Sequence, residues 1–308
     1  MNKTYCAKAF YHQHIDTRGK ARLCCYTNTL LDSIDFYSDE YEAIREQMID
    51  GNPIDHCSGC YQREENNEIS PRLIYNKEAE QYATLPPAPI DIDLRLRNSC
   101  NLACVMCNAS NSSTIAKNQG MEEPYKQITL PTISKDIRRV YMAGGEPFMI
   151  KEFQNMLDNI HNDDCEIIIN TNLTIRNDIF VEKLKRFSNV SLTVSMDAVG
   201  HRLENIRHGL VWEHFEENFD YFNDIFPIHI NTVLMENNKH DMIELAEWIN
   251  LREVVKWTIA EITSPASMAV TNVDSVYYDQ LLKTPQLKQL NNLHSRIAIR
   301  SIKNRKGI

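Results

Sequence analysis

From residue 90 onward, the sequence alternates between apolar runs and helix-like stretches. Two of these stretches, NDIFVEKLKRFS (177–188) and HDMIELAEWINL (240–251), separate runs with the pattern of β-strands. The strand-like runs are IDIDLRL (90–96), RRVYMAG (138–144), CEIIINTN (165–172), VSLTVSMD (190–197), IHINTVLM (228–235) and VVKWTIAEI (254–262). Six strands alternating with helices predict an α/β fold with a parallel sheet, either doubly wound or a partial barrel. In both folds, ligands bind at the carboxyl ends of the strands.

A proline-rich segment, LPPAP (85–89), precedes the first of these strands and reads as an extended linker. It predicts a domain boundary near residue 86, with a small cysteine-rich domain over 1–85 and the α/β core over 86–270. Residues 271–308 are then a helical tail. From residue 281 onward the tail contains Lys and Arg but no Asp or Glu. A solvated helix and a docking surface for an acidic partner both fit this composition.

Composition excludes several classes of protein. The 308 residues are 43% hydrophobic, so the chain can build a core. A net charge of −9 argues against broad nucleic-acid binding or binding to anionic membranes. No apolar stretch resembles a signal peptide or a membrane span. We therefore expect a soluble, cytoplasmic protein without nucleic-acid or membrane partners.

Three of the nine cysteines lie in the segment LRNSCNLACVMCNAS, with the spacing C-x3-C-x2-C. Cytosolic thiols stay reduced, so clustered cysteines indicate metal or cluster binding rather than disulfides. Soft thiolates favour zinc, copper(I) or iron–sulfur clusters. A 4Fe–4S cluster held by Cys100, Cys104 and Cys107 would leave one iron open, and an open position is where chemistry can occur.

The run CNLACVMC (100–107) resembles the cluster-binding motif of the radical S-adenosylmethionine (SAM) enzymes. AGGEP (143–147), SMD (195–197) and IRHG (206–209) are similar to further elements of that superfamily, and the resemblance extends over roughly residues 88–265. It implies a partial (β/α)6 barrel, a catalytic 4Fe–4S cluster and bound SAM. In this superfamily, one electron cleaves SAM to methionine and a 5′-deoxyadenosyl radical, which abstracts hydrogen from a substrate.

The resemblance also implies which residues contact SAM. They are Met106, Gly144, Gly145, Glu146, Asn172, Ser195, Asp197 and Arg207. The two glycines let the backbone approach the methionyl amine, and Glu146 supplies an anion to it. Ser195 and Asp197 can accept hydrogen bonds from the ribose hydroxyls, and Arg207 suits a carboxylate. Met106 stands where the superfamily often has an aromatic residue. Without the cysteines, the same residues fit turns, a helix cap and a surface ion pair.

A second set of cysteines lies in the first 60 residues. Cys6 and Cys24 flank Gly19 in the pattern C-x12-G-x4-C, and Cys57 and Cys60 form a C-x2-C pair. Four thiolates suit zinc or a closed iron–sulfur cluster. The layout resembles the SPASM or twitch domains that hold auxiliary 4Fe–4S clusters, although here it precedes the barrel. Cys25 can replace Cys24 as a ligand, whereas Cys165 is expected to be a small core residue.

The resemblance implies a radical SAM enzyme whose substrate is a peptide or protein side chain or backbone. The alternative is radical oxidation, epimerisation or rearrangement of a carbohydrate or small polar metabolite. A non-catalytic iron–sulfur binding protein is a third possibility from another class. The enzyme would need a one-electron reductant, such as flavodoxin or ferredoxin. The sequence identifies no catalytic acid or base, although Glu261 ends the sixth strand.

Overall fold

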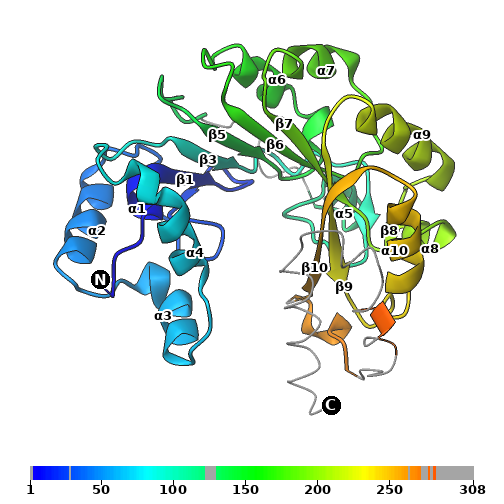
Figure 1. Cartoon of the computed structure of the whole chain (residues 1–308), viewed down its shortest axis with the longest axis horizontal. Coiled ribbons are helices and arrows are strands. Elements are labelled where there is room, and N and C mark those ends of the chain that lie inside the picture. Colours follow the sequence, from blue (N-terminus) through cyan, green and yellow to red (C-terminus); the bar gives the residue numbers. More distant parts are fainter. Residues whose placement is uncertain are drawn as a thin grey trace. The chain divides into compact units, whose positions relative to one another are not determined.

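The structure, a computed structural model, describes residues 3–27, 29–121, 130–262 and 264–271, together with residues 277, 280 and 281. It divides into two compact units. Figure 1 labels the helices and strands along the chain. The first comprises Met1–Asn98, Glu123–Ile168 and Phe180–Asn189, and the second comprises Ser99–Glu122, Ile169–Ile179 and Val190–Ile308. This division differs from the boundary expected near residue 86, which remains a prediction. The basic tail beyond residue 281 lies outside the described residues.

The first unit contains a mostly parallel set of strands. Its strands are β1 (His12–Ile15), β2 (Ala21–Arg22), β3 (Asp91–Leu94), β5 (Arg139–Met142) and the first half of β6 (Glu166–Thr171), in the order β6-β5-β3-β1-β2. Strand β3 pairs in parallel with both β1 and β5, and β2 is antiparallel to β1. Its helices are α1 (Lys8–Tyr11), α2 (Asp39–Ile49), α3 (Ser58–Glu65), α4 (Pro71–Glu78), α6 (Lys151–Leu157) and most of α7 (Asp178–Leu184). Short 3-10 helices are η1 (Asp55–Cys57), η2 (Ala79–Tyr82) and η3 (Pro147–Met149).

The second unit continues the alternation of strands and helices. Its main strands are the second half of β6, β7 (Val190–Ser195), β9 (Ile228–Leu234) and β10 (Val254–Glu261), in the order β10-β9-β7-β6. Strand β9 is parallel to both β7 and β10. A separate two-stranded ribbon pairs β4 (Ala103–Cys104) with β8 (Arg207–His208). The helices are α5 (Ser113–Asn118), α8 (His201–Ile206), α9 (Trp212–Asn223), α10 (Met242–Asn250) and the 3-10 helix η4 (Ala266–Met268).

The six strands predicted from the apolar runs are all present, and the α/β class with a mostly parallel sheet is confirmed. Closure into a partial barrel remains an expectation. Burial alternates along β9, as expected for a strand with one face in the core. On α9 and α10, the rings of Phe219 and Trp248 pack edge to face, with centroids 4.8 Å apart, which anchors these helices in the second unit.

Strand β1 was not predicted, and it changes the surroundings of β3. The apolar Ile92 and Leu94 are fully buried, as the strand pattern requires. Asp91 and Asp93, on the opposite face, are also buried, because β1 places His12 and His14 directly opposite them. Each histidine Nδ1 lies 3.0 Å from a carboxylate oxygen of its partner. The cysteine-rich N-terminal segment therefore contributes a strand to the same sheet as β3.

Candidate cofactor site

The loop with Cys100, Cys104 and Cys107 leads from β3 towards α5. Its thiols are partly exposed. At its start, the hydroxyl groups of Ser113 and Thr114 donate to the carbonyl of Cys100, at 3.1 and 2.7 Å. The amide of Cys107 donates to the carbonyl of Cys104 at 3.0 Å, which forms a tight turn. The loop is thus fixed at both ends while its three soft donors stay accessible, and this donor set fits an iron–sulfur cluster with one open iron.

Asn172 directly follows β6 and lies beside the first cysteine, whereas its contact with SAM remains a prediction. Its Nδ2 is 3.9 Å from Cys100 Sγ and donates to Asn101 Oδ1 at 3.1 Å. Its Oδ1 accepts from both the amide and the hydroxyl of Thr174, at 2.9 and 2.6 Å. These bonds orient the amide group so that its N–H groups face the cysteine loop.

Asp197 and Arg207 form a buried pair next to the second cysteine. Arg207 Nη2 lies 2.7 Å from Asp197 Oδ2, and the two side chains are 9% and 0% exposed. Arg207 Nη1 also donates to Cys104 Sγ at 3.8 Å. Burial raises the pKa of Asp197, and Arg207 offsets only part of that effect. The predicted contacts of these two residues with SAM remain predictions, since both side chains are engaged with each other here.

Met106 and Ser195 occupy different environments within the second unit. Met106 packs against a buried apolar cluster made of Ala198, Ile206, Met235 and Ile262. An apolar wall of this kind suits the flat face of an adenine ring. Ser195 is the last residue of β7, and it lies opposite Asn231 in β9.

The segment with Gly144, Gly145 and Glu146 belongs to the first unit and follows β5. Gly144 has φ of +119°, and a Cβ atom there would lie 2.7 Å from the carbonyl oxygen of Leu96. The amide of Gly145 donates to the carbonyl of Arg97 at 3.0 Å. Glu146 is fully buried and accepts from the amide of Phe148 at 3.2 Å, which caps η3. Glycine is required at position 144 for this close approach to the backbone of Leu96. The contact of this segment with the methionyl amine of SAM remains a prediction.

The four N-terminal cysteines predicted as one site line one cavity of about 200 Å³ in the first unit. Cys6, Cys24, Cys57 and Cys60 come from the turn before α1, the turn after β2, the end of η1 and the start of α3. A hydrogen bond links the thiols of Cys6 and Cys57, and it lowers the pKa of Cys6. Burial raises the pKa of Cys24 to about 11. Cys25 is exposed and does not line the cavity, which favours Cys24 as the fourth thiol.

Sequence reasoning missed the basic residues that surround these cysteines. The charged residues lining the cavity are Lys8, Arg63 and Arg72, and no Asp or Glu lines it. On α4, Arg72 and Asn76 both donate to the carbonyl of Tyr5, and Asn76 accepts from the amide of Ala7 at 2.7 Å. Helix α4 therefore fixes the backbone on both sides of Cys6. These residues are scattered through the sequence without a motif, so no signal identified them.

The remaining cysteine behaves as predicted. Cys165 is fully buried at the start of β6, and burial raises the pKa of its thiol to about 12. It is a small core residue. Among the described helices, none combines the length and the apolar content that a membrane span requires.

Comparison with known proteins decides the family. Residues 95–249, just over half of the 308-residue chain, match the Radical SAM superfamily. The chain belongs to this superfamily. The match contains the three-cysteine loop, so the superfamily's catalytic 4Fe–4S cluster and SAM are the implied cofactors.

Two curated proteins are similar to about half of the chain. The probable GTP 3′,8-cyclase of Methanococcus vannielii is 21% identical over 164 residues, which are 50% of this chain and 53% of that protein. The sporulation killing factor maturation protein SkfB of Bacillus subtilis is 22% identical over 163 residues, which are 52% of this chain and 39% of that protein. The chain thus spans about half the length, or less, of these relatives.

Among solved structures, SuiB of Streptococcus suis bound to its precursor peptide SuiA has a similar fold. The TM-score is 0.50 at 14% sequence identity, and the match covers 87% of this chain and 66% of that chain. At this identity, the likeness shows the fold alone. It agrees with the α/β class and the mostly parallel sheet described above.

Proposed function

We propose that this chain is a radical SAM enzyme that modifies a peptide or protein, with a second, auxiliary iron–sulfur cluster. The observation that carries the proposal is the presence of two separate thiol sets. One is the three-cysteine loop of the superfamily, and the other is the four-cysteine cavity of the first unit. Auxiliary cysteine sets of the SPASM or twitch type, which the N-terminal pattern resembles, often accompany peptide modification.

For the first site, Cys100, Cys104 and Cys107 would hold the catalytic cluster. When bound, that cluster supplies the electron that cleaves SAM and generates the 5′-deoxyadenosyl radical. The chain's own residues bind and orient the cofactor. The family resemblance assigns the methionyl amine to Gly144, Gly145 and the Glu146 carboxylate. Ser195 suits a ribose hydroxyl, and Met106 with its apolar neighbours suits the adenine.

For the second site, the size of the cavity favours a cluster over zinc. Zinc draws four sulfurs to about 2.3 Å from one point, which leaves no space between them. Here the four cysteines line a cavity of about 200 Å³, and the thiols of Cys6 and Cys57 are hydrogen-bonded to each other. A single water needs only about 10–15 Å³ on such a measure.

Three basic residues also favour an anionic group in this cavity. A cluster bound by four thiolates carries net negative charge. Lys8, Arg63 and Arg72 line the cavity, and of these Arg72 is already paired with Glu64 of α3. Opposite charges stabilise each other strongly where water is partly excluded. The same charge argument applies to an anionic zinc–thiolate site. The basic residues therefore support a thiolate-bound group in general, and the size of the cavity is what favours a cluster over zinc.

A peptide substrate is supported by SkfB, whose name describes the maturation of a sporulation killing factor. The second candidate is a small polar metabolite, and the match to a probable GTP 3′,8-cyclase favours it. A one-electron reductant such as flavodoxin or ferredoxin, and a cytoplasmic location, complete the proposal.

The test uses the full chain, reconstituted anaerobically with iron and sulfide, and supplied with dithionite and SAM. The probes are synthetic peptides encoded by small reading frames beside its gene, and in parallel GTP and uridine diphosphate sugars. We expect 5′-deoxyadenosine to form, and one peptide both to accelerate its formation and to change mass. Acceleration by GTP or a sugar nucleotide alone would instead support the second candidate.

A matched control tests the cluster assignment. Cys104→Ala should abolish 5′-deoxyadenosine formation, whereas Cys165→Ala, a change at the buried core cysteine, should retain it in whatever protein folds. If the wild-type protein carries a loaded cluster but forms no 5′-deoxyadenosine, the result would support a non-catalytic iron–sulfur protein instead. Retention in Cys104→Ala would show that the loop does not hold the catalytic cluster.

A further inference from the structure

Strand β8 clamps the cysteine loop through its backbone. Arg207 pairs with Cys104, and His208 pairs with Ala103, in an antiparallel ribbon. The amide of Val105 donates to the carbonyl of Ile206 at 2.9 Å, which extends the pairing. Arg207 therefore lies directly opposite Cys104, the second cysteine of the loop, in the paired strands.

A glycine after β8 allows the chain to lie close to the start of the cysteine loop. Gly209 follows β8 with φ of +100°, and a Cβ atom there would lie 3.2 Å from the carbonyl oxygen of Asn101 and 3.3 Å from Leu102 Cδ2. A larger residue would be strained by its backbone conformation and would crowd the start of the loop.

The side chain of Arg207 bridges a carboxylate and a thiol. One terminal nitrogen lies 2.7 Å from Asp197 Oδ2, and the other donates to Cys104 Sγ at 3.8 Å. Asp197 is itself fixed, since its Oδ1 accepts from the amide of Val233 at 2.8 Å and its carbonyl accepts from Asn238 Nδ2 at 3.0 Å. The guanidinium is always charged and rigid, so this geometry directs a permanent cation at one particular sulfur.

We infer that Arg207 is a positioning residue for the catalytic cluster, acting through Cys104, and that Asp197 orients Arg207. The inference rests on the proposed function. It assigns to this pair a role different from the ribose and carboxylate contacts that the family resemblance implies. A charge-assisted hydrogen bond to a thiolate stabilises negative charge on its sulfur. Hydrogen bonds to cluster sulfurs and nearby net charge both set the reduction potential of a cluster.

The physical consequence has a definite sign. Reduction adds negative charge to the cluster, and the Arg207 cation stabilises the reduced form more than the oxidised form. Arg207 thus raises the reduction potential and makes the cluster easier to reduce. Removing it should lower the potential, whereas removing a SAM-carboxylate contact would weaken SAM binding and leave the potential of the SAM-free cluster unchanged.

The experiment measures the midpoint potential of the SAM-responsive cluster by electron paramagnetic resonance in the full, reconstituted chain. The variants are Arg207→Gln, Arg207→Lys and Asp197→Asn. The matched control is Arg202→Gln, which breaks another arginine–aspartate pair, with Asp241, in the same unit. We expect Arg207→Gln to shift the midpoint to a more negative value and Arg207→Lys to shift it less. Asp197→Asn removes a buried anion beside Arg207 and leaves the cation, so its midpoint should shift to a more positive value. The control should match the wild-type protein in both its midpoint potential and its affinity for SAM.

An unchanged midpoint together with weaker SAM binding in Arg207→Gln would overturn the inference. If Arg207→Gln loses the catalytic cluster, iron content decides. Selective loss of that cluster, with Arg202→Gln fully loaded, supports positioning, and equal loss in both variants contradicts it. Failure of the proposed function is distinguishable, because the wild-type protein would then lack a SAM-responsive cluster altogether.

Discussion

At the scale of single residues, Gly144 shows how closely the backbone is packed after β5. Its positive φ and the carbonyl oxygens of Leu96 and Arg97, at 2.7 and 2.9 Å from a built Cβ, both exclude a side chain. Gly51 also has positive φ, at +83°, but nothing lies within 4 Å of a Cβ there. Comparing a substitution at Gly144 with the same substitution at Gly51 therefore separates the energetic cost of steric crowding from that of backbone strain.

We predict that Gly144→Ala destabilises the protein more than Gly51→Ala. Backbone strain alone should cost on the order of 1 kcal/mol at either position. Crowding against fixed carbonyl groups should add roughly 1–3 kcal/mol in Gly144→Ala. Urea unfolding of the two variants measures the difference in the free energy of unfolding. Equal destabilisation of the two variants would mean that the Leu96 carbonyl moves away from residue 144 at no cost in the free energy of unfolding.

At the candidate site, some residues could be predicted from the sequence and others could not. The spacing of Cys100, Cys104 and Cys107 identified the loop, because spacing within one short segment survives folding unchanged. The contact between Arg207 and Cys104 joins residues 103 positions apart. It depends on pairing between two strands of two residues each, and such short strands carry no periodic signal.

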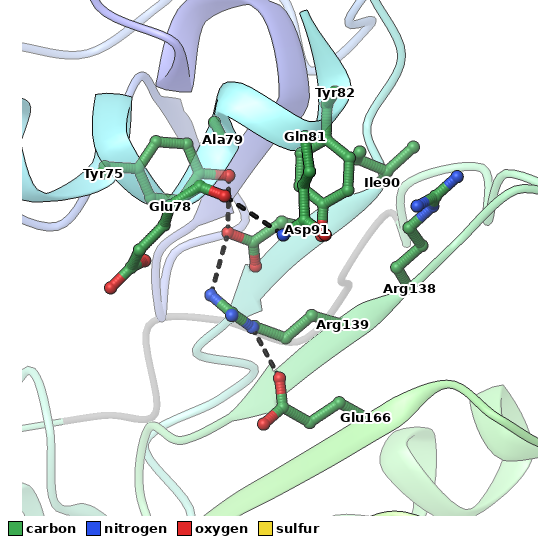
Figure 2. A pocket seen from close by; sticks show the side chains of 10 residues that line it. All are labelled: Tyr75, Glu78, Ala79, Gln81, Tyr82, Ile90, Asp91, Arg138, Arg139 and Glu166. Atoms are coloured by element: carbon green, nitrogen blue, oxygen red, sulfur yellow. Dashed lines mark hydrogen bonds and ion pairs between the residues drawn. The ribbon is translucent and has the colours of Figure 1, made fainter. Parts of the chain in front are cut away.

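At the scale of elements, the buried Asp91 of β3 forms the centre of a polar network, part of which Figure 2 shows from close by. Asp91 accepts from Tyr75 of α4 at 2.8 Å. Its carboxylate also lies 3.0 Å from Nδ1 of His12, in β1. Arg139 of β5 lies 3.8 Å from the same carboxylate and donates to Glu166 of β6 at 2.7 Å. Four elements of the first unit thus meet through one ionised side chain.

We predict that this network makes the protein sensitive to acid. Burial raises the pKa of Asp91, but His12, Lys8 and Arg139 outweigh it and lower the pKa to about 2. In the unfolded chain the pKa is near its ordinary value of about 4. The ionised form therefore stabilises the fold above about pH 4, and that contribution, about 2 kcal/mol, is lost as the pH falls towards 2.

The measurement is the free energy of unfolding between pH 2 and pH 6. Asp91→Asn should be less stable than the wild-type protein near neutral pH and should show a shallower dependence on acid. A matched change at Asp178, which is exposed and pairs with Arg176, should leave the acid dependence as it is in the wild-type protein. Identical slopes for wild type and Asp91→Asn would contradict the prediction.

The elements themselves were predicted well where the pattern was long. Each of the six apolar runs became a strand, because alternation over several residues reports a buried face directly. Strand β1, HQHI, escaped because two of its four residues are histidines, which the pattern counts as polar. Their burial depends on Asp91 and Asp93, about 80 residues away in sequence, and no local rule carries that information.

At the scale of the whole molecule, the cysteines divide between the two units. Cys100, Cys104 and Cys107 belong to the second unit, and the four cavity cysteines belong to the first. Each set has its own supporting contacts: Ser113, Thr114 and Arg207 for the loop, and α4 for the cavity. Because no residue belongs to both sets, we expect the two clusters to load independently.

This independence gives the final prediction. The reconstituted wild-type protein should contain about eight irons, four for each cluster. Replacing Cys100, Cys104 and Cys107 together by Ala should leave about four irons and a brown protein, since the four-cysteine cavity is untouched. The remaining cluster would have no open iron, so SAM should not alter its electron paramagnetic resonance signal. Replacing Cys57 and Cys60 by Ala should have the reverse effect and leave the SAM-responsive signal. A colourless triple variant with one tightly bound zinc would contradict the auxiliary cluster and would mean that the cavity closes around a single ion.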